Sequence, residues 1–421
     1  MAVALAADSA VTIGSDVNQK VYNSANKMFA LSKYHPVGIM MYGGANFMGV
    51  PWEIIIKSYR KELQKNKFDT LKEYMEDFLK FLIEDKRFFN PTSERELIER
   101  ICYTSLTTIL GDQVTKEINR LIKKGEQVQD EYVSSILENI IIEKIDEFQS
   151  LRNIINYEGF DEKFKQTYSD VIVEIIEDLL NFEVTDELKN SIVQYTGLLV
   201  QKETFSDSFS GLVISGYGEQ EIFPSLYEFY IEGIIFGELK YIERPTIHIG
   251  SSNDENHTTA AIRPFAQKEM VHSFMNGVEP SLHNVYLQVF SHALNQHFDF
   301  LEDIIDKSKV DDWHTIRNEH QEVLMSSIRS SVNEFKDEFF TQPIMNILDV
   351  LPKEEIAAMA EALVNLTSFK RKVTMDAETV GGPIDVAVIT KGDGFVWIKR
   401  KHYFKPELNY QFFNNYLGEE K

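Results

Sequence analysis

Three short segments in the N-terminal part of the chain carry residue types that could do chemistry together. Asp8 ends a small apolar run, Lys27 follows it, and Gly43 and Gly44 end the apolar run of residues 37–42. A carboxylate can fix the position of a lysine ammonium group, and a backbone N–H at a strand–helix corner can stabilise an oxyanion or bind another anion. Taken singly, Asp8 is more typical of a strand-end turn and Lys27 of a solvated lysine than of a catalytic site, and the two glycines could simply end a strand. Their interpretation as one site therefore depends on their order along the chain.

Other catalytic and metal-binding patterns are weak in this sequence. The Gly43-Gly44 turn lacks the Lys-Ser/Thr of a P-loop and the glycine pattern of a dinucleotide site. A regulator that binds a nucleotide or another anion at this helix start is therefore only a weak hypothesis. Glu269 and His272 have Glu-x-x-His spacing, but no second such pair completes a di-metal site. The single cysteine, Cys102, excludes an internal disulfide and is expected to be a small buried hydrophobic residue. We expect no metal and no organic cofactor.

Hydrophobic patterns predict the elements that position the N-terminal segments. The apolar run Val37–Tyr42 predicts a strand buried on both faces, and Pro51–Leu63 predicts a helix directly after it. A second helix is predicted from Thr70, because Thr70 and Glu73 have the spacing of a capping box. A third is predicted to start at Ser93, with Glu96 completing the same kind of box.

The rest of the chain alternates between helical and strand-rich regions, which predicts an α+β fold. Strands are predicted at residues 2–7, 211–218, 225–241 and 246–250 and in a hairpin at 383–399, with helices between them. We expect five parts in chain order: 1–90, 91–204, 205–275, 276–352 and 353–421. The second and fourth parts are predicted to be helical insertions, and the other three to form one strand-rich domain.

In order and context, the N-terminal motifs resemble the β-subunit of the proteasome and its bacterial relatives, the N-terminal nucleophile (Ntn) hydrolases. The matching stretches are Ala6–Thr12 (AADSAVT), Lys27–Phe29 and Gly38–Ala45 (GIMMYGGA), followed by an amphipathic helix. The resemblance covers about residues 2–90, 205–275 and 353–405 and implies an αββα sandwich of the Ntn type. It also implies roles for three residues. Asp8 and Lys27 match the Asp/Lys pair beside the nucleophile, and Gly43 matches the glycine whose amide helps to form the oxyanion hole.

Two later stretches extend this resemblance. Ser251, in residues 248–252 (HIGSS), matches the serine of the family's Gly-Ser element near the active site. Asp376, in residues 376–382 (DAETVGG), matches the aspartate of the family's Asp-x-x-Ser-Gly-Gly turn. This turn departs from the pattern, because one extra residue follows Asp376 and Val380 stands at the serine position. Thr379 is therefore the candidate substitute for that hydroxyl.

The implied reaction needs a nucleophile that the matching stretch does not supply. In the family, a terminal Thr, Ser or Cys attacks an amide, its own α-amino group can act as base, and a neighbouring lysine lowers proton affinities. That residue begins a strand before the AADS strand, whereas seven residues precede Asp8 here and Met removal would expose Ala2. Two interpretations follow. One is an amide- or peptide-bond hydrolase whose terminal Thr, Ser or Cys lies upstream, which would also supply a pairing partner for the strand at residues 2–7. The other is a catalytically silent assembly or interaction protein.

The composition narrows the partners that we expect. The chain has 421 residues with 43 Lys plus Arg against 66 Asp plus Glu, a formal net charge of −23. So acidic a chain has no global electrostatic reason to bind nucleic acid or an anionic membrane. No apolar run approaches the roughly 18–20 residues of a membrane span, and the first residues lack the basic region of a signal peptide. We expect a cytoplasmic homo-oligomer that binds peptide or protein substrates if it is active.

Overall fold

The computed structural model describes residues 1–13, 20–125, 129–250, 258–305, 312–374 and 380–417. The chain mixes 55% helix with 17% strand, in agreement with the predicted α+β class. It divides into two compact units. Unit 1 contains Met1–Ala25, His248–Val388 and Val396–Lys421, and unit 2 contains Asn26–Ile247 and Ile389–Phe395.

Unit 2 is built around a sheet whose strands follow the order β10-β9-β8-β5-β4, with β11 beside β9. Its strands are β4 (Met28–Ala30), β5 (Val37–Gly43), β8 (Ser210–Gly216), β9 (Ser225–Ile235), β10 (Glu238–Glu243) and β11 (Ile247–His248). Neighbours from β4 to β10 pair antiparallel. The predicted buried strand is confirmed as β5, whose first five residues are all buried.

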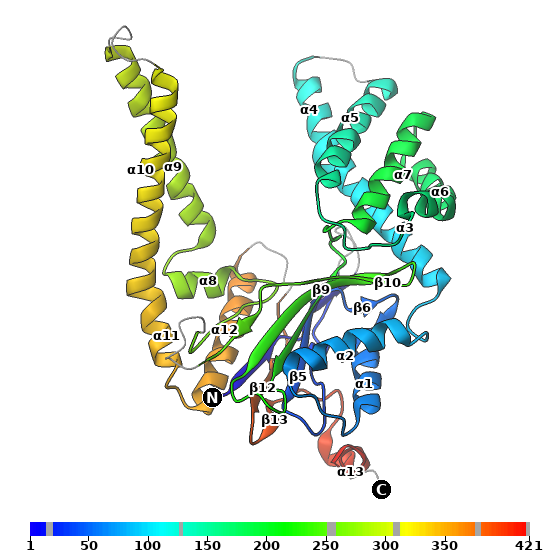
Figure 1. The fold of residues 1–421 in the computed structure, drawn as a ribbon, viewed down its shortest axis with the longest axis vertical. Coiled ribbons are helices and arrows are strands. Elements are labelled where there is room, and N and C mark those ends of the chain that lie inside the picture. The colour runs from blue at the N-terminus through cyan, green and yellow to red at the C-terminus, as the bar shows by residue number, and fades with distance from the viewer. Residues whose placement is uncertain (14–19, 126–128, 251–257, 306–311, 375–379, 418–421) are drawn as a thin grey trace. The chain divides into compact units, whose positions relative to one another are not determined.

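Two helices cover one face of this sheet, as Figure 1 shows: α1 (Trp52–Leu63) and α2 (Leu71–Glu84). They begin after a short hairpin of β6 (Asn46–Phe47) and β7 (Val50–Pro51). The predicted capping box of α2 is confirmed, because Thr70 Oγ1 accepts from the Glu73 N–H at 3.3 Å while the Glu73 carboxylate accepts from the Thr70 N–H at 3.0 Å. The sequence therefore fixes where the second helix starts.

Five more helices lie between α2 and β8: α3 (Pro91–Thr108), α4 (Thr115–Lys123), α5 (Asp130–Gln149), α6 (Phe160–Leu179) and α7 (Asp186–Gln201), with a π-helical turn at Ile109–Val114. The predicted start of α3 at Ser93 is wrong. The helix begins at Pro91, and Asn90 is its N-cap, accepting from the N–H groups of Thr92 and Ser93 at 2.9 and 3.0 Å. Asn is a strong N-cap residue and Pro suits the first helical position, so this pair sets the start instead of Ser93.

Most residues of a three-stranded sheet in the order β1-β12-β13 belong to unit 1. Its strands are β1 (Val3–Ala7), β12 (Asp385–Thr390) and β13 (Gly394–Lys399), and the last two confirm the predicted C-terminal hairpin. The helix α12 (Lys353–Val373) packs on β1, where Ala357 contacts an apolar cluster that includes Val386 and Val388. A separate two-stranded sheet joins β2 (Val11–Ile13) and β3 (Lys20–Tyr22).

The remaining elements of unit 1 are mostly helical. They are α8 (Glu269–Asn276), α9 (Pro280–Ile304), α10 (Trp313–Lys336), a π-helical turn at Asp337–Thr341, α11 (Gln342–Leu348), a 3-10 turn at Pro406–Leu408 and α13 (Tyr410–Leu417). α9 and α10 run side by side (Figure 1) and are joined by ion pairs from Arg317 to Asp299 at 2.8 Å and to Glu302 at 3.6 Å. None of the helices described combines the length and the apolar character that a membrane crossing requires.

Buried tyrosines join distant elements of unit 2 through carboxylates. The Tyr59 hydroxyl on α1 donates to Asp77 on α2 at 2.8 Å, and the Tyr168 hydroxyl on α6 donates to Glu94 on α3 at 2.6 Å. Burial, with the adjacent carboxylate, raises the pKa of both phenols far above the usual value. The neutral phenol is therefore the form that the folded state stabilises.

We expect unit 2 to lose stability as the pH rises above about 10, where the tyrosines of the unfolded chain ionise. The folded-state pKa values are raised, so the contribution is complete below that pH and is lost above it. Urea unfolding measured between pH 8 and pH 11.5 checks this. Tyr59→Phe should make the alkaline loss shallower, whereas Tyr103→Phe, at a half-exposed tyrosine on α3, should leave its slope unchanged. An identical slope in all three proteins would contradict the assignment.

Candidate functional site

The corner between β5 and the following helix is built on two glycines. Gly43 has a φ of +73°, and a Cβ at this position would lie 2.6 Å from the carbonyl oxygen of Phe209. A Cβ on Gly44 would lie 2.6 Å from the carbonyl oxygen of Ser208. The left-handed backbone and the close approach of the neighbouring chain both require glycine. The Gly-Gly pair is therefore needed for packing, whatever chemistry takes place beside it.

Hydrogen bonds hold this corner against the start of β8 and α1. The Gly44 N–H donates to Phe209 O at 2.8 Å, and the Ser210 hydroxyl donates to Gly44 O at 2.8 Å. The buried indole of Trp52 donates to the same Ser210 hydroxyl at 2.8 Å, and the Trp52 N–H donates to Ala45 O at 3.1 Å. The first residue of α1 thus fixes the corner through both its backbone and its side chain.

Lys27 directly precedes β4, the strand that pairs with β5, and it faces the same side of the sheet as Gly43. The register pairs Met28 with Met40, and the Met41 N–H donates to Lys27 O at 2.9 Å, so Lys27 lies directly opposite Met41. Gly43 is two residues beyond Met41 on β5, which makes it a diagonal neighbour of Lys27 at about 7–8 Å. The side chain of Lys27 is long enough to cover that distance.

The amide of Gly43 points toward the edge where Lys27 lies. Gly43 pairs with Ser210 on β8, and the neighbouring Gly44 N–H bonds to Phe209 O. In an antiparallel ladder, hydrogen-bonded and non-bonded pairs alternate, so Gly43 and Ser210 form a non-bonded pair. The Gly43 N–H bond therefore points away from β8 and toward β4. A half-buried lysine and a backbone donor thus belong to the same edge of the sheet, and groups of these two kinds can stabilise developing negative charge.

In unit 1, the aspartate that follows β1 binds the C-terminal glycine turn. The Asp8 carboxylate accepts from the N–H groups of Gly381 and Ala10, each at 3.0 Å. The Ser9 N–H donates to Gly381 O at 3.0 Å, and the Ser9 hydroxyl donates to Pro383 O. These contacts join segments that lie at opposite ends of the chain. Asp8 is thus half-buried in a defined position rather than being a solvated turn residue.

The structure gathers the predicted site residues into two groups. Lys27 and Gly43 lie together in unit 2, and Asp8 lies in unit 1 beside the glycines that follow Asp376 in the sequence. The predicted Asp8–Lys27 pair joins residues of different units and stays a prediction. Ser251 and Asp376 lie outside the described residues, as does Thr379.

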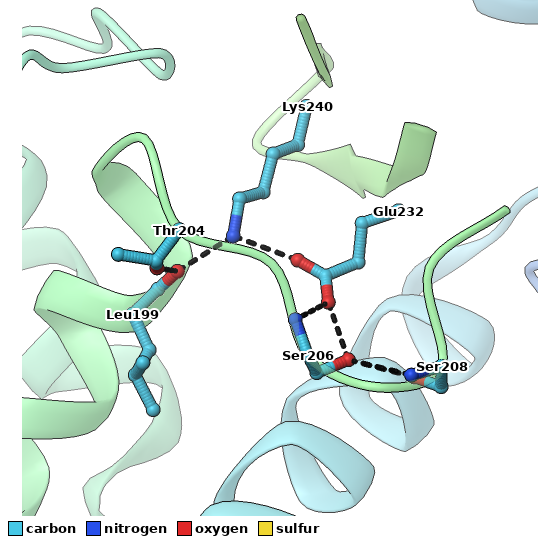
Figure 2. A network of polar contacts seen from close by, with 6 residues as sticks. All are labelled: Leu199, Thr204, Ser206, Ser208, Glu232 and Lys240. Carbon is cyan, nitrogen blue, oxygen red and sulfur yellow. Dashed lines mark hydrogen bonds and ion pairs between the residues drawn. The ribbon is translucent and has the colours of Figure 1, made fainter. Parts of the chain in front are cut away.

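Sequence reasoning missed a buried ion pair that Figure 2 shows. The Lys240 ammonium on β10 donates to Glu232 on β9 at 2.7 Å, and both side chains are 1% exposed. The other Glu232 oxygen accepts from the N–H of Ser206 at 2.8 Å and from its hydroxyl at 2.5 Å. The Ser206 hydroxyl also lies 2.8 Å from that of Ser208. The available signal was a glutamate, Glu232, in the mostly apolar strand β9 and a lysine, Lys240, on the strand that follows it.

The same lysine ties the preceding helical region to the sheet. Lys240 Nζ donates to the carbonyl oxygen of Leu199, near the end of α7, at 2.6 Å, and the Thr204 hydroxyl donates to this carbonyl at 2.9 Å. The Phe205 ring lies 5.1 Å from the ammonium group. Burial lowers the pKa of Lys240, and the ion pair with Glu232 opposes that shift. Because Lys240 is fully buried, we interpret this network as a structural clamp and not as a substrate site.

Cys102 and the metal-ligating residue types give no alternative site in the described residues. Cys102 is buried as predicted, and burial raises the pKa of its thiol to about 11, so the nucleophilic thiolate is scarce at neutral pH. Across the described residues, no cluster of three or more His, Cys, Asp or Glu side chains could hold a metal ion. The candidate chemistry therefore rests on the glycine corner with Lys27 and on Asp8 with its glycine turn.

The described residues define an α+β protein in which a lysine flanks a glycine strand–helix corner and an aspartate binds a second glycine turn. A scan against known protein families finds no match, and searches of curated proteins and of solved structures return none either.

We expect Lys240→Met to destabilise unit 2 by about 3–5 kcal/mol, because it leaves Glu232 buried without its cation. The double variant Lys240→Met with Glu232→Gln should recover part of that loss, since the buried charge is then removed. Urea unfolding followed by tryptophan fluorescence, with Trp313 and Trp397 replaced by Phe in every variant, measures both through Trp52. Lys189→Met, which removes an exposed ion pair with Glu177, should leave the midpoint nearly unchanged. A loss from Lys240→Met no larger than that of the control would show that the clamp is dispensable.

Proposed function

We propose that this chain has the Ntn-hydrolase fold of the proteasome β-subunit type and hydrolyses amide bonds in peptides or proteins. The nucleophile in this proposal is a terminal Thr, Ser or Cys on a strand that pairs with the outer edge of β1. The observation that carries the proposal is the bond from the Gly381 N–H to the Asp8 carboxylate. It joins two segments, far apart in sequence, that the resemblance to Ntn hydrolases assigns to one active site.

The position of β1 supports the place given to the nucleophile. In the sheet of the described residues, β1 is at the end of the order β1-β12-β13. An outer strand presents backbone N–H and C=O groups that can pair with a further strand. A strand added there would run beside the segment that ends at Asp8. The terminal residue of the added strand is the proposed nucleophile.

The geometry around Gly43 supports the remaining roles. The Gly43 N–H leaves β5 on the side of Lys27, and Lys27 is a diagonal neighbour on the same sheet face. In the proposal, the Gly43 amide donates to the oxyanion and the Lys27 ammonium lowers proton affinities at the nucleophile. Asp8 orients Lys27, and Ser251 and Asp376 keep the supporting roles that the resemblance implies.

The proposed reaction balances without a metal or an organic cofactor. The hydroxyl or thiol of the terminal residue attacks the amide carbon, and its proton passes to the α-amino group of the same residue. The carbon–nitrogen bond then breaks, and the leaving amine takes up that proton. Water attacks the resulting acyl-enzyme and releases the acid. We place this activity in a cytoplasmic homo-oligomer that binds neither nucleic acid nor membranes.

Determining the mature N-terminal residue separates this proposal from a catalytically silent assembly protein. The gene is expressed from its own locus with the upstream DNA intact, and the intact mass and N-terminal residue of the purified protein are measured. A chain that extends beyond Met1 and begins with Thr, Ser or Cys supports the hydrolase. A chain that begins at Met1 or Ala2 removes the Ntn mechanism and favours the silent assembly protein.

In that mature protein, we expect Lys27→Ala to lower the rate of peptide hydrolysis by about 100-fold or more, within the usual effect of removing a group that assists proton transfer. The assay follows hydrolysis of a mixture of fluorogenic peptides and labelling by an electrophilic β-lactone. Lys33→Ala, at an exposed lysine on the loop between β4 and β5, is the matched control and should retain the full rate. Full activity in Lys27→Ala would refute the role given to Lys27.

A further inference from the structure

The helix α9 carries two apolar faces, and one of them packs against α10. Phe298 is buried, and its ring lies 6.1 Å from that of His320 on α10. Leu287, Leu294 and Leu301 share the face of Phe298, because they lie at helical spacings of three, four and seven residues from one another or from it. Through Phe298, this face contributes to the pairing of α9 with α10.

The second face of α9 is apolar and exposed. Leu282, Tyr286, Val289 and Ala293 follow one another at spacings of four, three and four residues, the pattern of a helix–helix seam. Leu282 is 43% exposed, Tyr286 50% and Val289 59%. At 100° per residue, this seam lies about 120° around the helix from the face of Phe298. A helix that is apolar on two separate faces is typical of one with two helical neighbours.

The exposed surface is large enough for a second partner. Seven apolar side chains of α9 are each roughly half exposed: Leu282, Val285, Tyr286, Val289, Phe290, Phe300 and Ile304. Together they present on the order of 600 Å² of apolar area, which matches the largest patches on ordinary monomers and approaches the ~800 Å² per partner of a stable interface. Within the described residues, α9 buries only Phe298 and α10 only Met325. The arm formed by α9 and α10 therefore has little apolar core of its own.

The distribution of charge indicates what packs on this face of α9 and in which direction the two helices run. The chain has a net charge of −23, yet the segment Pro280–Phe298 contains no Asp, Glu, Lys or Arg. Two copies of so acidic a protein repel each other least where they meet through this uncharged segment. Asp299, Glu302 and Asp303 lie at the C-terminal end of α9, so a parallel pair would bring six carboxylates together. An antiparallel pair keeps the two acidic ends apart.

We infer that α9 is a homodimerisation helix whose partner is α9 of a second copy of this chain, packed antiparallel through Leu282, Tyr286, Val289 and Ala293. The two helices cross near Val289 and Ala293, where a twofold axis relates the two copies. The seam of one copy therefore packs against the same seam of the other copy. An apolar, uncharged seam is complementary to itself, as such a symmetric interface requires. This inference is independent of the proposed hydrolase activity.

Sedimentation of the full chain over a range of concentrations tests the interface. The wild-type protein should dimerise, and Val289→Glu should weaken the dimer about 100-fold or more, because it places an unpaired charge in the seam. Val350→Glu, at an exposed valine after α11, is the matched control and should leave dimerisation unchanged. Circular dichroism checks that both variants keep their helices. A monomeric wild-type protein, or a Val289→Glu variant that associates as the wild type does, would overturn the inference.

Disulfide trapping tests the direction of the pair. Val289→Cys should form a covalent dimer on mild oxidation, because this position lies near the crossing point. Leu282→Cys lies toward one end of the seam, and in an antiparallel pair it is far from its own equivalent, so it should remain uncrosslinked. The native Cys102 is buried and gives little background. Trapping through Leu282→Cys but not through Val289→Cys would refute the antiparallel arrangement.

Discussion

The buried ion pair between Lys240 and Glu232 organises unit 2, because the segment that it holds is also the one that shapes the glycine corner. Glu232 binds the backbone and hydroxyl of Ser206. A few residues later, Phe209 accepts the hydrogen bond from Gly44, and Ser210 contacts both Gly44 and Trp52. The ion pair is far from solvent, so water competes little for these hydrogen bonds. The position of the candidate oxyanion donor thus depends on a charge pair outside the site.

The same clamp explains how a strand-rich domain accommodates a long helical region. α3 to α7 occupy the chain between the first helices and β8, and they share one continuous apolar core with the sheet. Because α7 leads directly into the segment before β8, a shift of the C-terminal end of α7 would also shift β8. Lys240 binds the Leu199 carbonyl at that point and connects it to β9. The end of α7 is therefore held to the sheet by a hydrogen-bonded charge as well as by apolar packing.

The sequence predicted the parts of the structure that local patterns decide. The apolar run before Gly43 and the Thr70–Glu73 capping box each depend on a few neighbouring residues, and both are confirmed. The start of α3 was misplaced because Asn90 and Pro91 compete with Ser93 for the same helix end. The Lys240–Glu232–Ser206 network was missed because its members come from separate elements. The bond between Gly381 and Asp8 spans most of the chain, and the sequence offered only a family resemblance as a guide to it.

The topology of unit 1 also sets an order for folding during synthesis. β1 is made before the other described strands, but β12, the strand beside it in the sheet, follows more than 370 residues later. At the usual speed of translation, β1 waits about 20–75 s for that partner. The residues from Asn26 to Ile247 are complete long before then, so most of unit 2 can fold while β1 still lacks β12. β1 is therefore the described strand that waits longest for the partner beside it in the sheet, and during that time it is exposed to chaperones and to wrong strand pairing.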